Sequence, residues 1–522
     1  MARFISTQRV LIAPFLALAL LGCGDGNGNA AAAQSEAARE AARLVDPGSV
    51  SAADLQAAVS DERARAFYEA RDWRPAWTRD TAPGLVEALR GSIRHGLEPD
   101  NYMRPVEAAE GPTAREVALT LAALELAGAL GDGLVDPNEI FDIYTLPRPE
   151  TDLVAGLESA VADAAVGEWL DGLAPNDAEY RALSEAFVEQ ARRAAGGDDR
   201  SIESGDTIHE GDSDPRVPQI AQVLRENGYL SEDGASGDSA DLYTAALAEA
   251  VERMQDDFGL ATDGVVGPDT LAILNTGAEE RARTLAANLE RRRWLVRNPP
   301  GTRIDVNIAA ATLAYYRDGE LRDSRNVVVG QPDWETPQLG SPIYRLVANP
   351  TWTVPKSIEE DEFAGRGASY LRRNNMVRRD GWIVQLPGPE NALGRVKFDM
   401  QNDHAIYLHD TPAKHLFERN QRHFSHGCVR VENAEEFARM LAQEAGVLAE
   451  YQQARASGEE TFVDLPANIP VRLLYFTAFR DASGKVVFRT DPYGWDGRVA
   501  EALGYEPREE RRLRRHIRDV GP

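Results

Sequence analysis

The sequence has little cysteine and too little positive charge to balance its acids, and each shortage excludes a class of protein. Only two of its 522 residues are cysteines, which excludes a disulfide framework and a multi-cysteine zinc site. Acidic residues outnumber basic ones by 84 to 57, giving a net charge of −27. We therefore expect no nucleic-acid partner, because that function needs a basic surface. Hydrophobic residues make up 43% of the chain, which is typical of a globular protein.

No long apolar run marks a membrane span near the N-terminus. The run over 10–21 is about half of the ~20 residues that a spanning helix needs, and two arginines precede it, as in a secretory signal. It ends in Leu-Leu-Gly-Cys at 20–23, which resembles a bacterial lipobox. The resemblance implies that the signal peptide 1–22 is removed and that Cys23 is lipidated as a membrane anchor. An ordinary signal peptide cut nearby is the alternative, and both readings predict export to the periplasm or cell envelope.

Changes in composition and hydrophobic period divide the rest of the chain. Apolar residues at helical spacing give way to a Gly-, Asp- and Ser-rich stretch, then to further helical segments, and finally to alternating and β-branched runs. The predicted units are a flexible tether (23–49), an all-α scaffold domain (50–195), a linker (196–214), a small three-helix domain (215–278), a connecting helix (279–298), a mainly β domain (299–500) and a basic tail (501–522). We therefore expect a multidomain α+β protein.

The three-helix segment carries a recognisable signature. A glutamine in its second predicted helix is followed by Gly-Leu, Asp-Gly, Gly and Thr at fixed intervals, namely at Gln255, Gly259, Leu260, Asp263, Gly264, Gly267 and Thr270. This pattern resembles the peptidoglycan-binding domain of bacterial wall enzymes. The signature mostly encodes the fold, so whether residues 215–278 bind glycan stays open.

The second cysteine lies beside most of the histidines. Five of the eight histidines fall between 404 and 426, directly before Cys428. A metal site and a nucleophile site are the two interpretations, and a single thiol without a paired carboxylate favours the nucleophile. We therefore expect no metal or cofactor, and a zinc hydrolase is the weaker alternative. Three of these histidines are expected to be surface or packing residues: His404, His415 and His423.

A free thiol, with a pKa of about 8.5, needs a base to react near neutral pH. His409 follows a short apolar run that holds it rigidly, and we predict it as the general base and acid. Asp410 is the predicted orienter of its ring, through the carboxylate or the backbone carbonyl. Gly427 permits a tight turn, so that its amide and that of Cys428 face the developing oxyanion.

The spacing of these residues resembles a known family. His409 is followed, after the fifteen residues 410–424, by the motif Ser-His-Gly-Cys-Val-Arg at 425–430. This arrangement resembles the catalytic domain of L,D-transpeptidases, the YkuD family. Further segments resemble the larger YcbB-type members, which also carry a helical scaffold: WTVP at 352–355, QLPGP at 385–389, LGRVKF at 393–398 and DPYG at 491–494.

The resemblance implies a reaction on peptidoglycan stem peptides. Cys428 would attack the bond between the third residue of a tetrapeptide stem and its terminal D-Ala, release D-Ala, and pass the acyl group to an amine of a second stem as a 3→3 cross-link. Carbapenems are the implied covalent inhibitors. An L,D-carboxypeptidase and a non-catalytic wall-anchoring protein are the alternatives.

Four further residues are predicted to contact substrate: Tyr407, Ser425, His426 and Arg430. For Arg430, bracing of the loop is an equal alternative. Residues 357–382 contain several arginines and are predicted either as a lid that meets the acidic stems or as a plain surface insertion.

Overall fold

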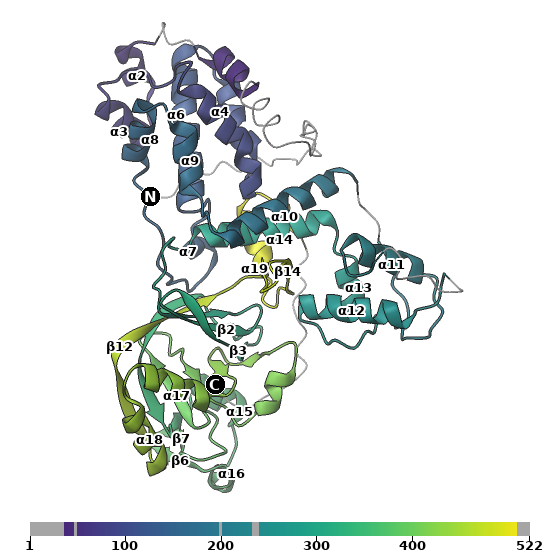
Figure 1. Ribbon diagram of the computed structural model, residues 1–522. Coiled ribbons are helices and arrows are strands. Elements are labelled where there is room, and N and C mark those ends of the chain that lie inside the picture. The colour runs from purple at the N-terminus through teal and green to yellow at the C-terminus, as the bar shows by residue number, and fades with distance from the viewer. Residues whose placement is uncertain (1–35, 46–49, 198–200, 232–239, 509–522) are drawn as a thin grey trace.

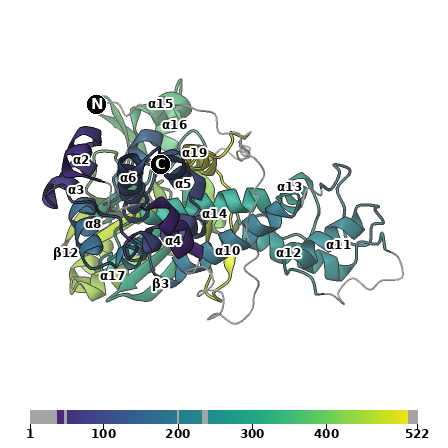
Figure 2. The same ribbon diagram turned by 90° about the horizontal axis from the view of Figure 1, so that it is seen from above.

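The computed structural model describes residues 36–45, 50–197, 201–231 and 240–508. The predicted signal peptide, Cys23 and residues 509–522 of the basic tail lie outside these ranges. Figure 1 shows a helical region above, a β-rich region below, and a small helical unit to one side; Figure 2 shows that this unit projects away from the other two. Within the described ranges, no helix combines the length and apolar character needed to cross a membrane. The predicted multidomain α+β class is confirmed.

The helical region is built around one long apolar helix. Its helices are α2 (Ala52–Ala58), α3 (Glu62–Ala70), α4 (Ala82–Gly91), α5 (Pro99–Ala108), α6 (Pro112–Gly131), α7 (Pro137–Ile140), α8 (Leu153–Ala162), α9 (Val166–Leu173) and α10 (Ala178–Ala195). Carboxylates cap several N-termini: the side chains of Asp61, Asp152 and Asp177 each accept from amides of the first turn. Helix α6 is buried over most of its length, which makes it the centre of this core.

The predicted tether is partly structured. Residues 36–44 are helical, and Ala41 is only 1% exposed against the helical region. Glu40 forms an ion pair with Arg90 at 2.7 Å. The boundary of the tether was therefore wrong for these residues, because small alanines at helical spacing are sufficient to pack a short helix onto the scaffold.

The three-helix unit consists of α11 (Val217–Glu226), α12 (Ala245–Phe258) and α13 (Pro268–Leu274). Gln255 is its central polar residue: its amide group donates to Asp263 and Thr270, and its carbonyl oxygen accepts from the amides of Asp263 and Gly264. Gln255 is 1% exposed, so these contacts stabilise the fold and leave the residue no surface with which to bind a ligand.

The predicted linker 196–214 is also shorter than expected. Ile202 and Ile208 are buried in the core of the three-helix unit, and Ile208 pairs with Val266 in a β-bridge. Two isolated apolar residues were enough to attach this otherwise polar stretch. The linker prediction is therefore wrong from Ile202 onward.

Helix α14 (Ala278–Arg293), the predicted connecting helix, joins the helical region to the β-rich region. It packs along α10, as Figure 1 shows. Within α14, Arg293 and Glu290 form a buried ion pair at 2.6 Å. Both residues also contact the backbone of the helical region: Arg293 donates to the carbonyl of His95, and Glu290 accepts from the amide of Val135. Arg291 pairs with Asp496 at the start of α19 (Trp495–Ala502), near the end of the β-rich region.

A nine-stranded mixed sheet forms the β-rich region. Its strands are β1 (Arg303–Asn307), β2 (Thr312–Arg317), β3 (Glu320–Gly330), β4 (Leu339–Ala348), β8 (Val396–Met400), β9 (Leu408–His409), β10 (His423–Ser425), β11 (Val429–Val431) and β12 (Thr461–Leu474). The order is β10-β3-β11-β9-β8-β4-β12-β1-β2, and β2 also pairs with β3, so the sheet closes on itself. The short strands β9 and β11 therefore lie side by side between β3 and β8. Helices α17 (Ala434–Glu444) and α18 (Leu448–Ser457) follow β11.

Residues 357–382, the predicted lid, belong to a small layer with its own core. The layer contains β5 (Trp352–Thr353), α15 (Lys356–Glu362), α16 (Ala368–Arg373), β6 (Met376–Arg379) and β7 (Trp382–Gln385). Its three strands pair in the order β5-β7-β6. Trp352, Phe363 and Ile383 are buried together, and Tyr407 packs against this cluster. The segment is thus a folded unit beside β9.

Candidate active site

Strand pairing brings the two predicted catalytic residues onto one surface. Strands β9 and β11 are parallel, with Arg430 opposite His409 and Val429 opposite Leu408. Cys428 directly precedes this pairing, and the amide of Val429 donates to the carbonyl of Tyr407 at 3.1 Å. Because side chains alternate along a strand, those of Tyr407, His409, Cys428 and Arg430 project from the same face of the sheet.

The imidazole of His409 is held in one tautomer. Its Nδ1 lies 2.5 Å from the carbonyl oxygen of Asp410, which can only accept, so Nδ1 carries the proton. Nε2 is therefore the basic atom, and it is buried without a hydrogen-bond partner among the described residues. Burial, assisted by the Arg430 cation, lowers the pKa of His409 well below its usual value. The ring is thus neutral near pH 7 and ready to accept a proton.

Asp410 orients His409 through its backbone. Its carboxylate instead accepts from the amide of Arg395 at 2.9 Å and forms an ion pair with Lys414. Gly394, with φ +61°, allows the carboxylate to approach, since a Cβ there would lie 2.4 Å from it. Of the two alternatives predicted for Asp410, the structure therefore favours the backbone carbonyl.

The thiol of Cys428 is enclosed. The residue is 5% exposed, and burial raises the pKa of its thiol, although contacts with Tyr407 partly oppose that rise. Sγ lies 3.7 Å from the carbonyl oxygen of Ala405. A protonated thiol in this position needs a neighbouring base before it can act as a nucleophile.

The turn before Cys428 is fixed by Ser425. The Ser425 hydroxyl donates to the carbonyl of Cys428 at 2.6 Å and accepts from the amide of Gly427 at 3.1 Å. Gly427 has φ +109°, a left-handed conformation that favours glycine. Ser425 is fully buried, so the predicted contact between its side chain and substrate is replaced by a structural role. The Gly427 amide, predicted to face the oxyanion, is engaged by the same hydroxyl.

His426 and Arg430 lie in different surroundings. His426 Nε2 is 3.4 Å from Glu362 of the predicted lid, and its ring packs edge-on against Trp334 at 4.9 Å between centroids. Arg430 is 1% exposed, which favours bracing of the sheet over direct contact with a substrate.

The remaining histidines of this window behave as predicted. His404 and His415 are exposed, whereas His423 is buried with Nε2 3.0 Å from the carbonyl of Ile308.

Lys397 also lies at the site, although no local pattern in the sequence predicted a role for it. It lies opposite His409 on β8, with Nζ 4.1 Å from the Tyr407 ring centroid and 2.6 Å from Asp399. Its cation therefore lies above the aromatic ring that borders Cys428. Its place on the polar face of a strand that alternates polar and apolar residues was the available signal, but alternation alone does not identify the neighbouring strand.

Because His423 is buried, we expect it to lower the unfolding free energy of the protein on acidification. Its pKa is lowered to about 4 by burial, so the unfolded chain takes up a proton as pH falls through about 6.5 while the folded chain does not. The contribution of neutral His423 to the unfolding free energy is therefore complete above about pH 6.5 and is lost as the pH falls toward about 4. From about pH 7.5 to about pH 5, we expect wild type to lose roughly 2 kcal/mol more unfolding free energy than His423→Gln. Urea unfolding of both proteins at both pH values measures this difference, and equal losses would contradict it.

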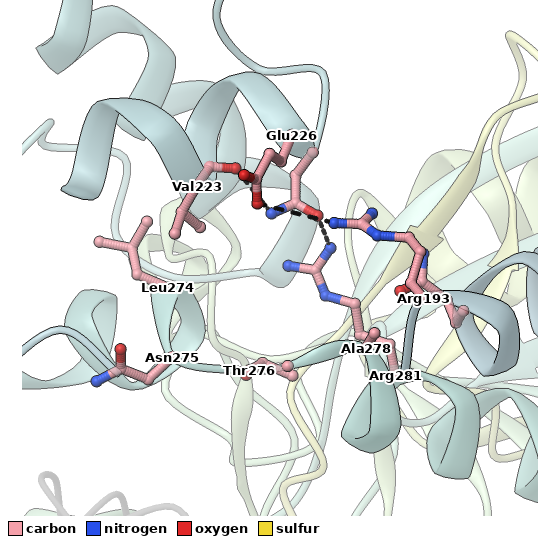
Figure 3. Close-up of a pocket in the computed structure, with 11 residues that line it drawn as sticks. Arg193, Val223, Glu226, Leu274, Asn275, Thr276, Ala278 and Arg281 are labelled. Atoms are coloured by element: carbon pink, nitrogen blue, oxygen red, sulfur yellow. Dashed lines mark hydrogen bonds and ion pairs between the residues drawn. The ribbon is translucent and has the colours of Figure 1, made fainter. Parts of the chain in front are cut away.

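A small open pocket lies elsewhere, between the helical region and the three-helix unit (Figure 3). Arg281 bonds to Asn227 across it, and Glu226 lies 4.0 Å from Arg193. Its lining residues fall between 190 and 281, so it contains none of the predicted site residues. The pocket marks the joint between the two units.

Comparison with known families agrees with this arrangement. Residues 301–454 match the L,D-transpeptidase catalytic domain (YkuD), residues 62–187 match the Scaffold domain, and residues 213–274 match the "Putative peptidoglycan binding domain". A Haemophilus influenzae protein named "Putative L,D-transpeptidase" is 34% identical over 220 residues, which are 38% of this chain and 45% of that protein. The chain thus aligns with less than half the length of this relative.

Solved structures give a more distant likeness. An L,D-transpeptidase from Xylanimonas cellulosilytica is 18% identical, with a TM-score of 0.18, and the match covers 52% of this chain and 98% of that one. The catalytic domain of an E. faecium L,D-transpeptidase acylated by ertapenem is 16% identical, with a TM-score of 0.18, over 26% and 85% of the two chains. The family matches show that this chain carries an L,D-transpeptidase catalytic domain of the YkuD family, together with a scaffold domain and a peptidoglycan-binding domain.

Proposed function

We propose that the chain is an L,D-transpeptidase that forms 3→3 cross-links in peptidoglycan, using Cys428 as the nucleophile. The observation that carries the proposal is the arrangement of His409 on β9 and Cys428 directly before β11: a buried thiol projects from the same face as an imidazole whose basic Nε2 is unpartnered among the described residues. The YkuD match supports the reaction class. We place this chemistry in the periplasm or cell envelope, with Cys23 as the lipid anchor.

In the first half-reaction, Nε2 of His409 takes the thiol proton as Sγ attacks the carbonyl carbon of the third stem residue. The bond to D-Ala breaks as the amine takes that proton from His409, leaving a thioester on Cys428. The fixed Nδ1–H to Asp410 contact keeps the ring aligned through both transfers.

In the second half-reaction, an amine of another stem attacks the thioester carbonyl. Nε2 removes its proton and returns it to Sγ as the new amide forms, which regenerates the thiol. Lys397, whose Nζ pairs with Asp399 at 2.6 Å, lies over the Tyr407 ring at this site. The partners of the enzyme are therefore two peptidoglycan stems, one as donor and one as acceptor.

An L,D-carboxypeptidase would use the same first half-reaction and pass the acyl group to water. Mass spectrometry of products from purified tetrapeptide muropeptides separates the two functions. We expect cross-linked dimers that retain one D-Ala fewer than the two starting stems. Tripeptides without dimers would assign hydrolysis instead. Dimers would also exclude a purely wall-anchoring role.

A further inference from the structure

The loop between β3 and β4 packs directly on the turn that carries Cys428. The amide of Gln331 donates to the carbonyl of Ser425 at 2.9 Å, and the hydroxyl of Thr336 donates to the carbonyl of Gly427 at 2.8 Å. Thr336 is fully buried, so this hydroxyl is unavailable to solvent. The contact joins residues 91 positions apart in the chain.

The direction of the Gly427 carbonyl determines the direction of the next amide. In a planar trans peptide, the C=O and the following N–H point in opposite directions. By holding the Gly427 oxygen, Thr336 therefore fixes where the N–H of Cys428 points. The Gly427 amide already donates to Ser425, so the Cys428 amide is the donor of this turn on which oxyanion stabilisation depends most.

The hydrogen bonds around Thr336 direct its hydroxyl proton toward Gly427. Its Oγ1 accepts from the amide of Gly330 at 2.8 Å, so the hydroxyl proton is free to point to Gly427. Its amide donates to the hydroxyl of Tyr493 at 3.3 Å, and that hydroxyl donates to the carbonyl of Gly330 at 2.5 Å. Tyr493 is 1% exposed. Gly330 is needed for this closeness, because a Cβ there would lie 2.1 Å from the Trp334 carbonyl oxygen.

We infer that Thr336, held by Tyr493, is a positioning residue that aims the Cys428 amide at the oxyanion formed during acyl transfer. The inference rests on the proposed function. Neither residue touches substrate: Thr336 acts through the Gly427 peptide, and Tyr493 acts through Thr336 and Gly330. Loss of the Thr336 hydroxyl should slow attack on carbonyl groups and leave the thiol itself as reactive as before.

Two reactions of the same thiol distinguish this role from a general effect on folding. Acylation by a carbapenem passes through an oxyanion, whereas alkylation by iodoacetamide does not. For Thr336→Val in the full chain, we expect acylation of Cys428 to slow by about tenfold, less than the ~100-fold or greater loss when a donor itself is removed. Alkylation should be unchanged, and Thr336→Ser, which keeps the hydroxyl, should restore acylation.

Tyr493→Phe is the second variant and should slow acylation without slowing alkylation, which keeps the test decisive if Thr336→Val does not fold. Equal acylation by wild type and the folded variants, or a parallel loss of alkylation, would overturn the inference. If wild type itself gains no carbapenem on Cys428, the proposed function fails; if wild type reacts and the variants match it, only the positioning role fails.

Discussion

Replacing Cys428 with alanine is expected to lower D-Ala release from tetrapeptide stems by at least ~10⁴-fold, because removal of the nucleophile eliminates the thioester path. Cys428 is 5% exposed, and its side chain projects from the same face of the sheet as that of His409. The measurement is the rate of D-Ala release from purified muropeptides.

Cys428→Ser is the matched control for shape, since it replaces sulfur by oxygen and preserves the turn held by Ser425. We expect it to remain folded and to be nearly as inactive as the alanine variant, because a hydroxyl is a far weaker nucleophile near neutral pH than an activated thiol. D-Ala release at the wild-type rate by either folded variant would remove Cys428 from the reaction.

Replacing His409 with alanine should slow acylation by about 10²- to 10⁴-fold near neutral pH, the usual contribution of a positioned general base. The pKa of Cys428 is raised by burial, so without a base little thiolate is present. In the variant, iodoacetamide alkylation should therefore be slow near neutral pH and should recover as alkali ionises the thiol directly. Stopped-flow or quenched alkylation across pH measures this recovery.

The wild-type pH profile provides a separate check on His409. Its pKa is lowered well below the usual value, so the imidazole stays neutral and basic as pH falls through about 6.5. Wild-type acylation should therefore persist below that pH. His404→Ala is the matched control, because His404 is exposed in the same stretch of chain. This variant should leave the rates of acylation and of iodoacetamide alkylation unchanged. A His409→Ala variant that matches this control would exclude His409 as the base.

The sequence predicted the parts of the molecule that local patterns encode. The helical period predicted the all-α scaffold domain, and the change to alternating and β-branched runs predicted the mainly β domain. The histidine–cysteine motif identified two residues that β9 and β11 place on one face. In these cases neighbouring residues along the chain specify the structure, so no knowledge of distant contacts is needed.

Features set by distant contacts were missed or misjudged. The residues around Ser425 in the sequence do not show whether its hydroxyl faces a substrate or, as in the structure, bonds to the backbone of Cys428. The contact of Thr336 with Gly427 depends on how β3 and β4 pair within the closed sheet, which no local period specifies. Ile202 was assigned to a linker because its neighbours are polar, yet its single apolar side chain is buried in the three-helix unit. Tertiary burial decides such positions.

Intact-mass analysis with a carbapenem, followed by peptide mapping, tests most directly whether Cys428 accepts an acyl group. The full-length wild-type protein is expected to gain the mass of one carbapenem, mapped to the peptide that contains Cys428, and Cys428→Ala to gain none. A wild-type protein that gains no mass, or an equal gain by Cys428→Ala, would contradict a cysteine acyl-transfer mechanism.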